Sequence, residues 1–167
     1  GLTDAERDAV GEIANINMGT AATTLSTLLN NKVTITKAGT YSVSGKVEDG
    51  QIIIDAGKED KVYLILNGAD INCSNSAPIY VKNAKKAIIS LAEGTENNIT
   101  DRETYVFEDE SSNDPNAAIF SKDDMTIIGS GKLTVNANYN NGIASNDDLK
   151  IQSGNIIVNA KNNGIKG

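Results

Sequence analysis

The chain has 167 residues with a formal net charge of −7, no histidine, one cysteine and only 4% aromatic residues. The absence of histidine excludes His-based triads, His metal sites and a His general base, and the single cysteine excludes an internal disulfide. The acidic balance argues against nucleic acid as a partner, because phosphate backbones are bound by clustered Lys and Arg. No stretch approaches the roughly 20 apolar residues that span a bilayer, so we expect no membrane partner either.

The first 32 residues are predicted to be helical. Thr3 and Glu6 have the spacing of a capping box at a helix start, and a second segment follows Gly19. Apolar residues recur at helical spacing in both segments. The pattern predicts two short amphipathic helices, with these residues on their apolar faces: Leu2, Val10, Ile13 and Ala14, then Ala21, Leu25, Leu28 and Leu29.

Beyond Lys32 the hydrophobic period changes from helical spacing to two. Short runs rich in β-branched residues are separated by clusters of Gly, Asn and Asp, which is typical of strands joined by turns. The predicted strands are Val33–Thr36, Thr40–Ser44, Gln51–Asp55, Val62–Leu66, Ala87–Leu91, Met125–Ile128, Leu133–Val135, Leu149–Ile151 and Ile156–Val158.

Internal repeats decide how these strands are arranged. The segment 118–127 is echoed 24 residues later by 142–151, and Asn141-Gly142-Ile143 returns 22 residues later as Asn163-Gly164-Ile165. A fainter copy begins at Pro78. A period in the low twenties is one turn of a parallel β-helix, in which each coil buries its inward Ile and Val against its neighbours. Residues 93–115 break the period and are predicted to form a long loop.

Both ends of such a solenoid expose apolar side chains and strand edges. We expect the N-terminal helices to lie across the first coil as a cap, with Leu25, Leu28 and Leu29 as the covering residues. The sequence stops at residue 167 in the middle of a repeat. We therefore expect a truncated domain with a frayed or neighbour-paired last coil, and end-to-end homo-oligomers through the exposed coils.

Several separated motifs, in order over about residues 33–167, resemble a family of secreted clostridial-type carbohydrate-binding domains. The resemblance implies a right-handed parallel β-helix similar to pectate lyases, binding of polygalacturonate (pectin) or cellulose, bound calcium, and an extracellular or cell-surface location. Lyase activity is not implied by it. The motifs are Ile35-Thr36-Lys37-Ala38-Gly39-Thr40-Tyr41, Val62-Tyr63-Leu64-Ile65-Leu66-Asn67-Gly68, Ser76-Ala77-Pro78-Ile79-Tyr80-Val81-Lys82-Asn83-Ala84, and the Ser-Lys-Asp-Asp and Asn-Asn-Gly-Ile repeats.

Residues 2–26 resemble a different family, the CheC-type chemotaxis and flagellar switch phosphatases. In that family a Glu and an Asn three residues later orient the attacking water at a phosphorylated response regulator, and Glu12 and Asn15 occupy these positions. The resemblance implies a cytoplasmic parent for this segment. We interpret the chain as a chimera of a helical segment, 1–32, and a β-helical carbohydrate-binding domain, 33–167, with no secretion signal at its start.

The candidate metal ligands are aspartates one repeat apart: Asp123 with Asp147, and Asp124 with Asp148. Stacked coils would place each pair about 4.8 Å apart, and Ca²⁺ would relieve the repulsion between these carboxylates. The alternative is that each Asp pair simply forms the polar turn before a strand. Family members often have acidic residues before Gly-Ile, where this chain has Asn141 and Asn163, whose amide oxygens are further candidate ligands.

The candidate sugar contacts are aromatic and basic. Tyr105 and Phe107 lie within the acidic loop and Tyr139 lies in another loop, where they could stack on sugar rings. Lys82, Lys85 and Lys86 form the basic cluster, which could meet uronates. The alternative for both groups is an ordinary solvated loop or turn.

The sequence thus favours non-catalytic, calcium-assisted binding of an acidic plant cell-wall polysaccharide. One alternative is a chimeric protein that keeps neither parent's activity, and another is a response-regulator phosphatase fragment. A polysaccharide lyase is the third, but lyases usually need an Arg or Lys base beside calcium. The arginines, Arg7 and Arg102, both lie outside the repeating coils.

Overall fold

The computed structural model describes residues 23–25 and 32–167, and every regular element in this part of the chain is a strand. None of these residues forms a helix long and apolar enough to cross a bilayer. The strands are β1 (Thr23–Leu25), β2 (Lys32–Ile35), β3 (Gly39–Val47), β4 (Gln51–Asp55), β5 (Lys61–Asn72), β6 (Ile79–Asn83), β7 (Lys86–Leu91), β8 (Glu96–Thr100), β9 (Ala117–Ser121), β10 (Asp124–Gly129), β11 (Lys132–Ala137), β12 (Asn141–Ser145), β13 (Leu149–Ile151), β14 (Asn155–Ala160) and β15 (Ile165–Lys166).

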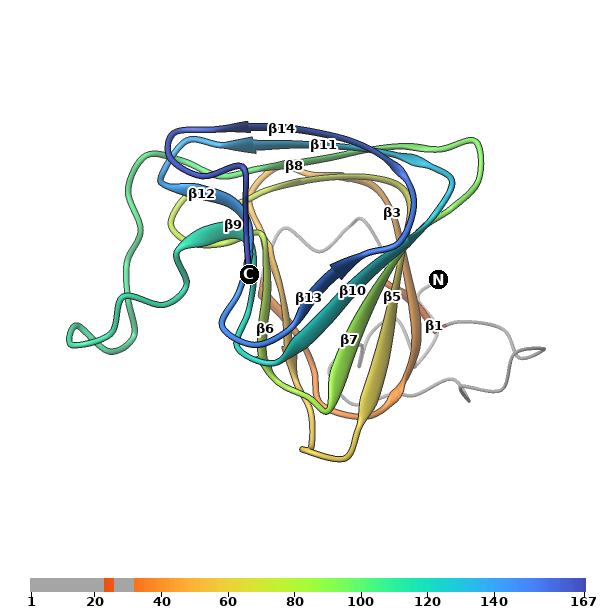
Figure 1. The fold of residues 1–167 in the computed structure, drawn as a ribbon, viewed down its shortest axis with the longest axis horizontal. Coiled ribbons are helices and arrows are strands. Elements are labelled where there is room, and N and C mark those ends of the chain that lie inside the picture. The colour runs from red at the N-terminus through yellow and green to blue at the C-terminus, as the bar shows by residue number, and fades with distance from the viewer. Residues whose placement is uncertain (1–22, 26–31) are drawn as a thin grey trace.

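The strands wind into stacked coils with a three-sided outline (Figure 1). One side, which we call the β6 face, is the sheet β2-β4-β6-β9-β12-β15. A larger sheet supplies the other two sides, the β7 face (β3-β5-β7-β10-β13) and the β8 face (β5-β8-β11-β14). Strand β5 is long enough to belong to both, since it pairs first with β7 and then with β8.

Every strand pair in the described residues is parallel, and equivalent positions of the repeats are vertical neighbours. Ile79 pairs with Ile119, Ile119 with Ile143, and Ile143 with Ile165. This confirms the predicted mainly-β, parallel coil stack and its register. Right-handed winding is what parallel crossovers adopt, and it stays a prediction here.

The core is one column of aliphatic side chains that point inward from all three faces. Ile54, Leu64, Leu66, Ile89 and Ile127 are completely buried within it. Burial of stacked Ile, Val and Leu side chains is the main source of stability in such a fold, because each coil contacts only its neighbours.

The helical prediction is wrong at Thr23–Leu25, which forms strand β1. Thr23, Thr24 and Leu25 pair in parallel with Tyr41, Ser42 and Val43 of β3. Two adjacent β-branched threonines favour a strand, and the open edge of β3 offers them backbone partners. The remainder of the predicted helices, with Leu28, Leu29, Glu12 and Asn15, lies outside the described residues, and the predicted helical cap therefore stays a prediction.

The boundaries of the predicted long loop need correction. Residues 96–100 form strand β8, with Asn97 and Ile99 buried and Thr100 beside Asn136. The loop proper runs over 101–116, between β8 and β9. The acidic composition of this region hid a short strand whose inward residues alternate in the ordinary way.

The last coil is open. Ile165 continues the column of Ile79, Ile119 and Ile143, yet it is 51% exposed, and Ile151 and Ile157 are exposed as well. These side chains form the surface of the last described coil, and the expected frayed or neighbour-paired edge stays a prediction.

Candidate functional site

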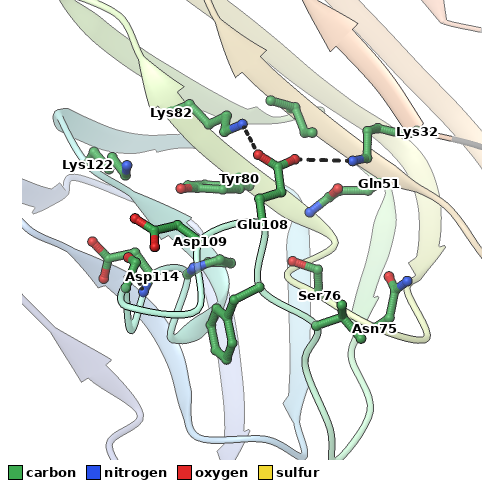
Figure 2. A pocket seen from close by; sticks show the side chains of 15 residues that line it. Lys32, Gln51, Asn75, Ser76, Tyr80, Lys82, Glu108, Asp109, Asp114 and Lys122 are labelled. Atoms are coloured by element: carbon green, nitrogen blue, oxygen red, sulfur yellow. Dashed lines mark hydrogen bonds and ion pairs between the residues drawn. The ribbon is translucent and has the colours of Figure 1, made fainter.

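A groove of about 400 Å³ lies on the outer side of the β6 face, beside the loop 101–116 (Figure 2). We call it the Glu108 groove, after the carboxylate at its centre. Strands β2, β4 and β6 contribute one wall and the loop contributes the other. Its lining residues are Lys32, Gln51, Ile53, Asn75, Ser76, Tyr80, Lys82, Val106, Phe107, Glu108, Asp109, Ser112, Asp114, Pro115 and Lys122.

Alternation along the strands brings the basic residues of the groove outward. Tyr80 pairs with Phe120 and Val81 with Ser121, so Lys82 and Lys122 occupy the next positions on adjacent coils. The Lys122 N–H donates to the carbonyl of Val81, which fixes this register. Two ammonium groups therefore project from neighbouring coils on the same face.

The floor of the groove, at Ile53 and Tyr80, belongs to a second, smaller hydrophobic cluster outside the coil. Ile53, Tyr80, Phe120 and Ala144 point away from the coil interior and are buried under the loop, and Ala77, Ala117 and Tyr105 complete the cluster. The Tyr80 and Phe120 ring centroids are 5.8 Å apart. Burial, with the charges of Asp114, Glu108 and Asp55, raises the pKa of Tyr80 to about 12, so its hydroxyl is neutral at physiological pH.

Glu108 connects the loop to the lysines. Its Oε2 lies 2.9 Å from Lys82 Nζ and its Oε1 lies 3.5 Å from Lys32 Nζ, as Figure 2 shows. The hydrogen bond and charge of Lys82, with a smaller contribution from Lys32, lower the pKa of Glu108. Lys82 Nζ also lies 5.8 Å from the centroid of the Tyr80 ring. Lys82 and Lys32 thus form a carboxylate-binding site, and the carboxylate that occupies it is that of Glu108.

The base of the loop is anchored by a buried carboxylate. Asp101 is 0% exposed, and it accepts hydrogen bonds from the Tyr105 hydroxyl and, at 2.5 Å, from the backbone N–H of Asn138. Burial raises the pKa of Asp101, and the same burial together with the charge of Asp101 raises that of Tyr105. These bonds hold the start of the loop against the turn that follows β11.

The predicted aromatic contacts are placed differently from one another. The Tyr105 ring stacks on Tyr139 with centroids 4.0 Å apart and planes at 15°, and only 6% of Tyr105 is exposed. Its faces are used inside the protein, which does not fit a role in stacking on sugars. Phe107 is half-buried and lines the groove, whereas Tyr139 packs behind the loop. Phe107 is therefore the one of the three that is placed to meet a groove ligand.

The predicted lysine cluster is dispersed over three locations. Lys82 lies in the groove, Lys85 lies in a turn 3.8 Å from Glu59, and Lys86 begins β7 on another face. The structure adds Lys32, Lys122, Tyr80 and Glu108, which the sequence did not single out. A signal for Lys122 existed, because aligning the faint repeat at Pro78 with Ala118 places Lys82 opposite Lys122.

The aspartate ladder has the predicted register, because Asp124 and Asp148 directly precede Met125 and Leu149, which pair with each other. The carboxylate of Asp123, however, accepts hydrogen bonds from Lys58 Nζ at 3.1 Å and from the Ala84 N–H at 3.0 Å. Asp124 Oδ1 accepts a longer one, 3.3 Å, from the Asp148 N–H. The backbones of Asp123 and Asp147 donate equivalently to Ser121 and Ser145 hydroxyls, which is turn geometry.

The described residues contain no group of three or more Asp, Glu, Cys or His side chains able to hold a metal ion. Asn141 is buried, and its Oδ1 accepts from the Asn163 N–H at 3.2 Å while its Nδ2 donates to Asn116. Asn163 is exposed in the last coil. Asp123 is paired with Lys58, and the carboxylates of Asp124, Asp147 and Asp148 do not by themselves form a closed calcium site in the described residues.

Comparisons with known proteins support both resemblances seen in the sequence. A family model described as "Carbohydrate-binding domain-containing protein" matches residues 29–167, and the CheC-like family matches residues 6–36. A carbohydrate-binding domain-containing protein of Acetivibrio thermocellus is 56% identical over 129 residues, 77% of this chain and 45% of that protein. The flagellar motor switch phosphatase FliY of Bacillus subtilis is 44% identical over 89 residues, 53% of this chain and 22% of that protein.

A solved structure has the same fold. It is described as a polysaccharide lyase-like protein from C. thermocellum, gadolinium derivative, and it matches with a TM-score of 0.81 and 55% identity over 82% of this chain and 55% of that chain. The chain thus spans about half the length of the relatives that match its β-helical part.

Proposed function

Because the chain belongs to the family of carbohydrate-binding domain-containing proteins, we propose that it binds an acidic polysaccharide, such as polygalacturonate, in the Glu108 groove without cleaving it. The observation that carries the proposal is the convergence of Lys32, Lys82 and Lys122 on one open groove beside Tyr80 and Phe107. Ammonium groups recognise uronate carboxylates, and an aromatic surface packs against the apolar face of a sugar ring.

A matched pair of double variants tests the site by titration calorimetry. Lys82→Gln with Lys122→Gln removes two groove charges, and we expect it to lower the affinity for polygalacturonate by about tenfold or more. The control, Lys46→Gln with Lys132→Gln, removes two charges that pair with Glu48 and Glu96 away from the groove. Equal losses in both would refute the site. Preference for cellulose oligosaccharides over polygalacturonate would refute the acidic ligand.

Calcium enters this proposal only together with the ligand. Asp124 and Asp148 would hold the ion with a uronate carboxylate completing the oxygen set, and the ion would supply positive charge between the acids. A related structure is described as a gadolinium derivative, so a trivalent lanthanide is a suitable probe for a calcium site in this protein. We expect terbium luminescence to rise on addition of polygalacturonate in the unaltered protein and not in Asp124→Asn/Asp148→Asn. Polymer binding that is identical in calcium and in chelator would reject the calcium component.

Lyase activity is the rival within the same fold. A non-catalytic module yields no unsaturated uronate, so the ultraviolet absorbance of polygalacturonate solutions should stay constant in the presence of the protein and calcium. An absorbance increase that depends on protein concentration would show that the protein cleaves the polymer, and would contradict the non-catalytic proposal.

A second candidate function rests on the CheC-like match at residues 6–36. Glu12 and Asn15 would orient water at a phosphorylated response regulator, as the family resemblance implies. Phosphate release from such a regulator, measured for the unaltered chain and for Glu12→Gln, tests this candidate. Equal rates for the two proteins would reject it.

The location and self-association of the protein follow from these proposals. A polysaccharide-binding function would place the β-helix outside the cell or at its surface. The exposed Ile151 and Ile165 would support end-to-end contact between copies. Sedimentation that is independent of protein concentration would reject this contact.

A further inference from the structure

We propose that Glu108 is a built-in competitor that occupies the carboxylate position of the groove, so that an acidic ligand binds by displacing it. The inference rests on the proposed function and names the group that sets the affinity and selectivity of that site. It starts from one contact: both oxygens of Glu108 face an ammonium group, Lys82 at 2.9 Å and Lys32 at 3.5 Å.

The chemistry of Glu108 matches that of the ligand. A uronate carries a carboxylate with the same charge and the same paired oxygens as glutamate, so it makes the same charge-assisted hydrogen bonds to ammonium groups. Two carboxylates cannot share the Lys32 and Lys82 positions without strong mutual repulsion. Binding of a uronate at these two lysines therefore requires that Glu108 move away.

The loop is held in place but its carboxylate is replaceable. The segment before Glu108 is fixed by the buried Asp101 and by the Val106 N–H, which donates to the Asn75 carbonyl at 2.8 Å. The far end is tied by Asn146 Nδ2, which donates to Asp114 at 2.9 Å. The Glu108 side chain itself is 68% exposed. Ion pairs in contact with water are weak and exchange readily, so the side chain can leave while the loop stays.

Tethering makes Glu108 a selective competitor. A carboxylate on a short loop has an effective concentration in the millimolar range at its partner, so a single sugar acid at lower concentration displaces it poorly. A polymer with several carboxylates can also engage Lys122, one coil along from Lys82, in place of its interaction with the exposed Asp109, and gains from this second contact. The groove should therefore prefer oligouronates over monomers. Neutral sugars can accept hydrogen bonds from the lysines but lack the stronger charge-assisted contact of a carboxylate.

The test compares Glu108→Gln with Glu110→Gln, a control in the same exposed loop. At low salt we expect Glu108→Gln to bind oligogalacturonate about three- to tenfold more tightly than the unaltered protein. It should also narrow the affinity difference between galacturonate monomer and oligomer. Glu110→Gln should stay within about twofold of the unaltered protein. Both substitutions are on the surface, and equal melting temperatures will show that the fold is intact.

The possible outcomes distinguish a failure of the competitor role of Glu108 from a failure of the proposed polysaccharide binding. Measurable and equal affinities in all three proteins would reject the competitor role of Glu108 and leave the proposed function standing. Absence of oligogalacturonate binding in all three would reject the proposed function, and the inference with it. A separate measurement needs no ligand: Lys82 should be acetylated faster by a small reagent in Glu108→Gln than in Glu110→Gln, and equal rates would contradict the contact.

Discussion

At the scale of single residues, Asn97 fixes the corner where β5 passes from the β7 face to the β8 face. Its Oδ1 accepts hydrogen bonds from the backbone N–H groups of Gly68 and Ala69 at 2.9 and 2.8 Å. Its Nδ2 donates to Thr95 Oγ1 and to the Lys132 carbonyl. A side chain with 1% exposure thus satisfies backbone groups on both neighbouring coils.

Replacing Asn97 by alanine should be strongly destabilising, because it leaves these buried backbone groups without partners. We expect a loss of about 2 to 4 kcal/mol in the free energy of unfolding, measured by urea denaturation. The control is Asn98→Ala, on the outer side of the same strand, which should lose less than about 1 kcal/mol. Similar losses for both would contradict the corner role.

Asp101 should give the protein a characteristic pH dependence. Its folded-state pKa is raised by burial, so the folded state holds the proton more tightly than the unfolded state, where the pKa is near its usual value of about 3.9. The contribution of Asp101 to stability therefore improves as the pH falls from 7 through the raised pKa toward about 4.

The variant Asp101→Asn isolates this effect, because Glu108 and Asp109 have lowered pKa values and act in the opposite direction. We expect the free energy of unfolding of the unaltered protein, relative to that of Asp101→Asn, to increase as the pH is lowered from 7 to 4. A difference that is constant across this range, in urea titrations at each pH, would show that Asp101 titrates normally.

At the scale of elements, the turns between strands depend on close backbone approach. Gly129, at the end of β10, has φ of +98°, and a Cβ there would lie 2.2 Å from the Leu91 carbonyl oxygen of the coil below. Gly94 also has a positive φ, +73°, but a Cβ there would meet nothing within 4 Å. A side chain at Gly94 would therefore meet only the strain of the positive φ, whereas a side chain at Gly129 would meet that strain and a steric clash.

Alanine at these two glycines should therefore have unequal effects. Gly94→Ala should cost about 1 to 2 kcal/mol through the positive φ alone. Gly129→Ala should cost at least about 2 kcal/mol more, since the coil spacing must open to admit the methyl group. Equal urea midpoints for the two variants would show that the β10–β11 turn can relax around a side chain.

The sequence predicted the elements unevenly. Alternation of Ile and Val made many strands from Val33 onward recognisable, and the repeat placed Ile119 beside Ile143 correctly. Strands β6, β9, β12 and β15 of the β6 face were not among the predicted strands. Strands β9 and β12 are buried at every position and therefore show no alternation. Strand β8 was missed because its inward positions are Asn97 and Ile99 rather than two aliphatic residues. The groove was mostly missed for a related reason: Glu108 and Lys32 are 76 residues apart, and a loop outside the repeat carries no register from which to infer their contact.

At the scale of the whole molecule, stability should depend on position along the stack. Ile119 lies between two other isoleucines of its column and is 0% exposed, whereas Ile165 ends that column. We expect Ile119→Ala to cost about 2 to 5 kcal/mol and Ile165→Ala about 1 kcal/mol or less, from urea midpoints. A large effect at Ile165 would mean that another surface covers the last coil in solution.

The loop 101–116 leaves the coil at the end of β8 and returns at the start of β9, and the strands on either side keep their register with the coils above and below. The stacking of the coils thus continues unchanged past the loop, and the loop is tied to the coil at its base by Asp101 and Tyr105. Substituting the part of the loop beyond the buried Tyr105 by one of different length or charge should change the lining of the Glu108 groove without moving the column of isoleucines. The groove can therefore acquire a new lining through one segment of the chain while the rest of the stack keeps its sequence and its packing.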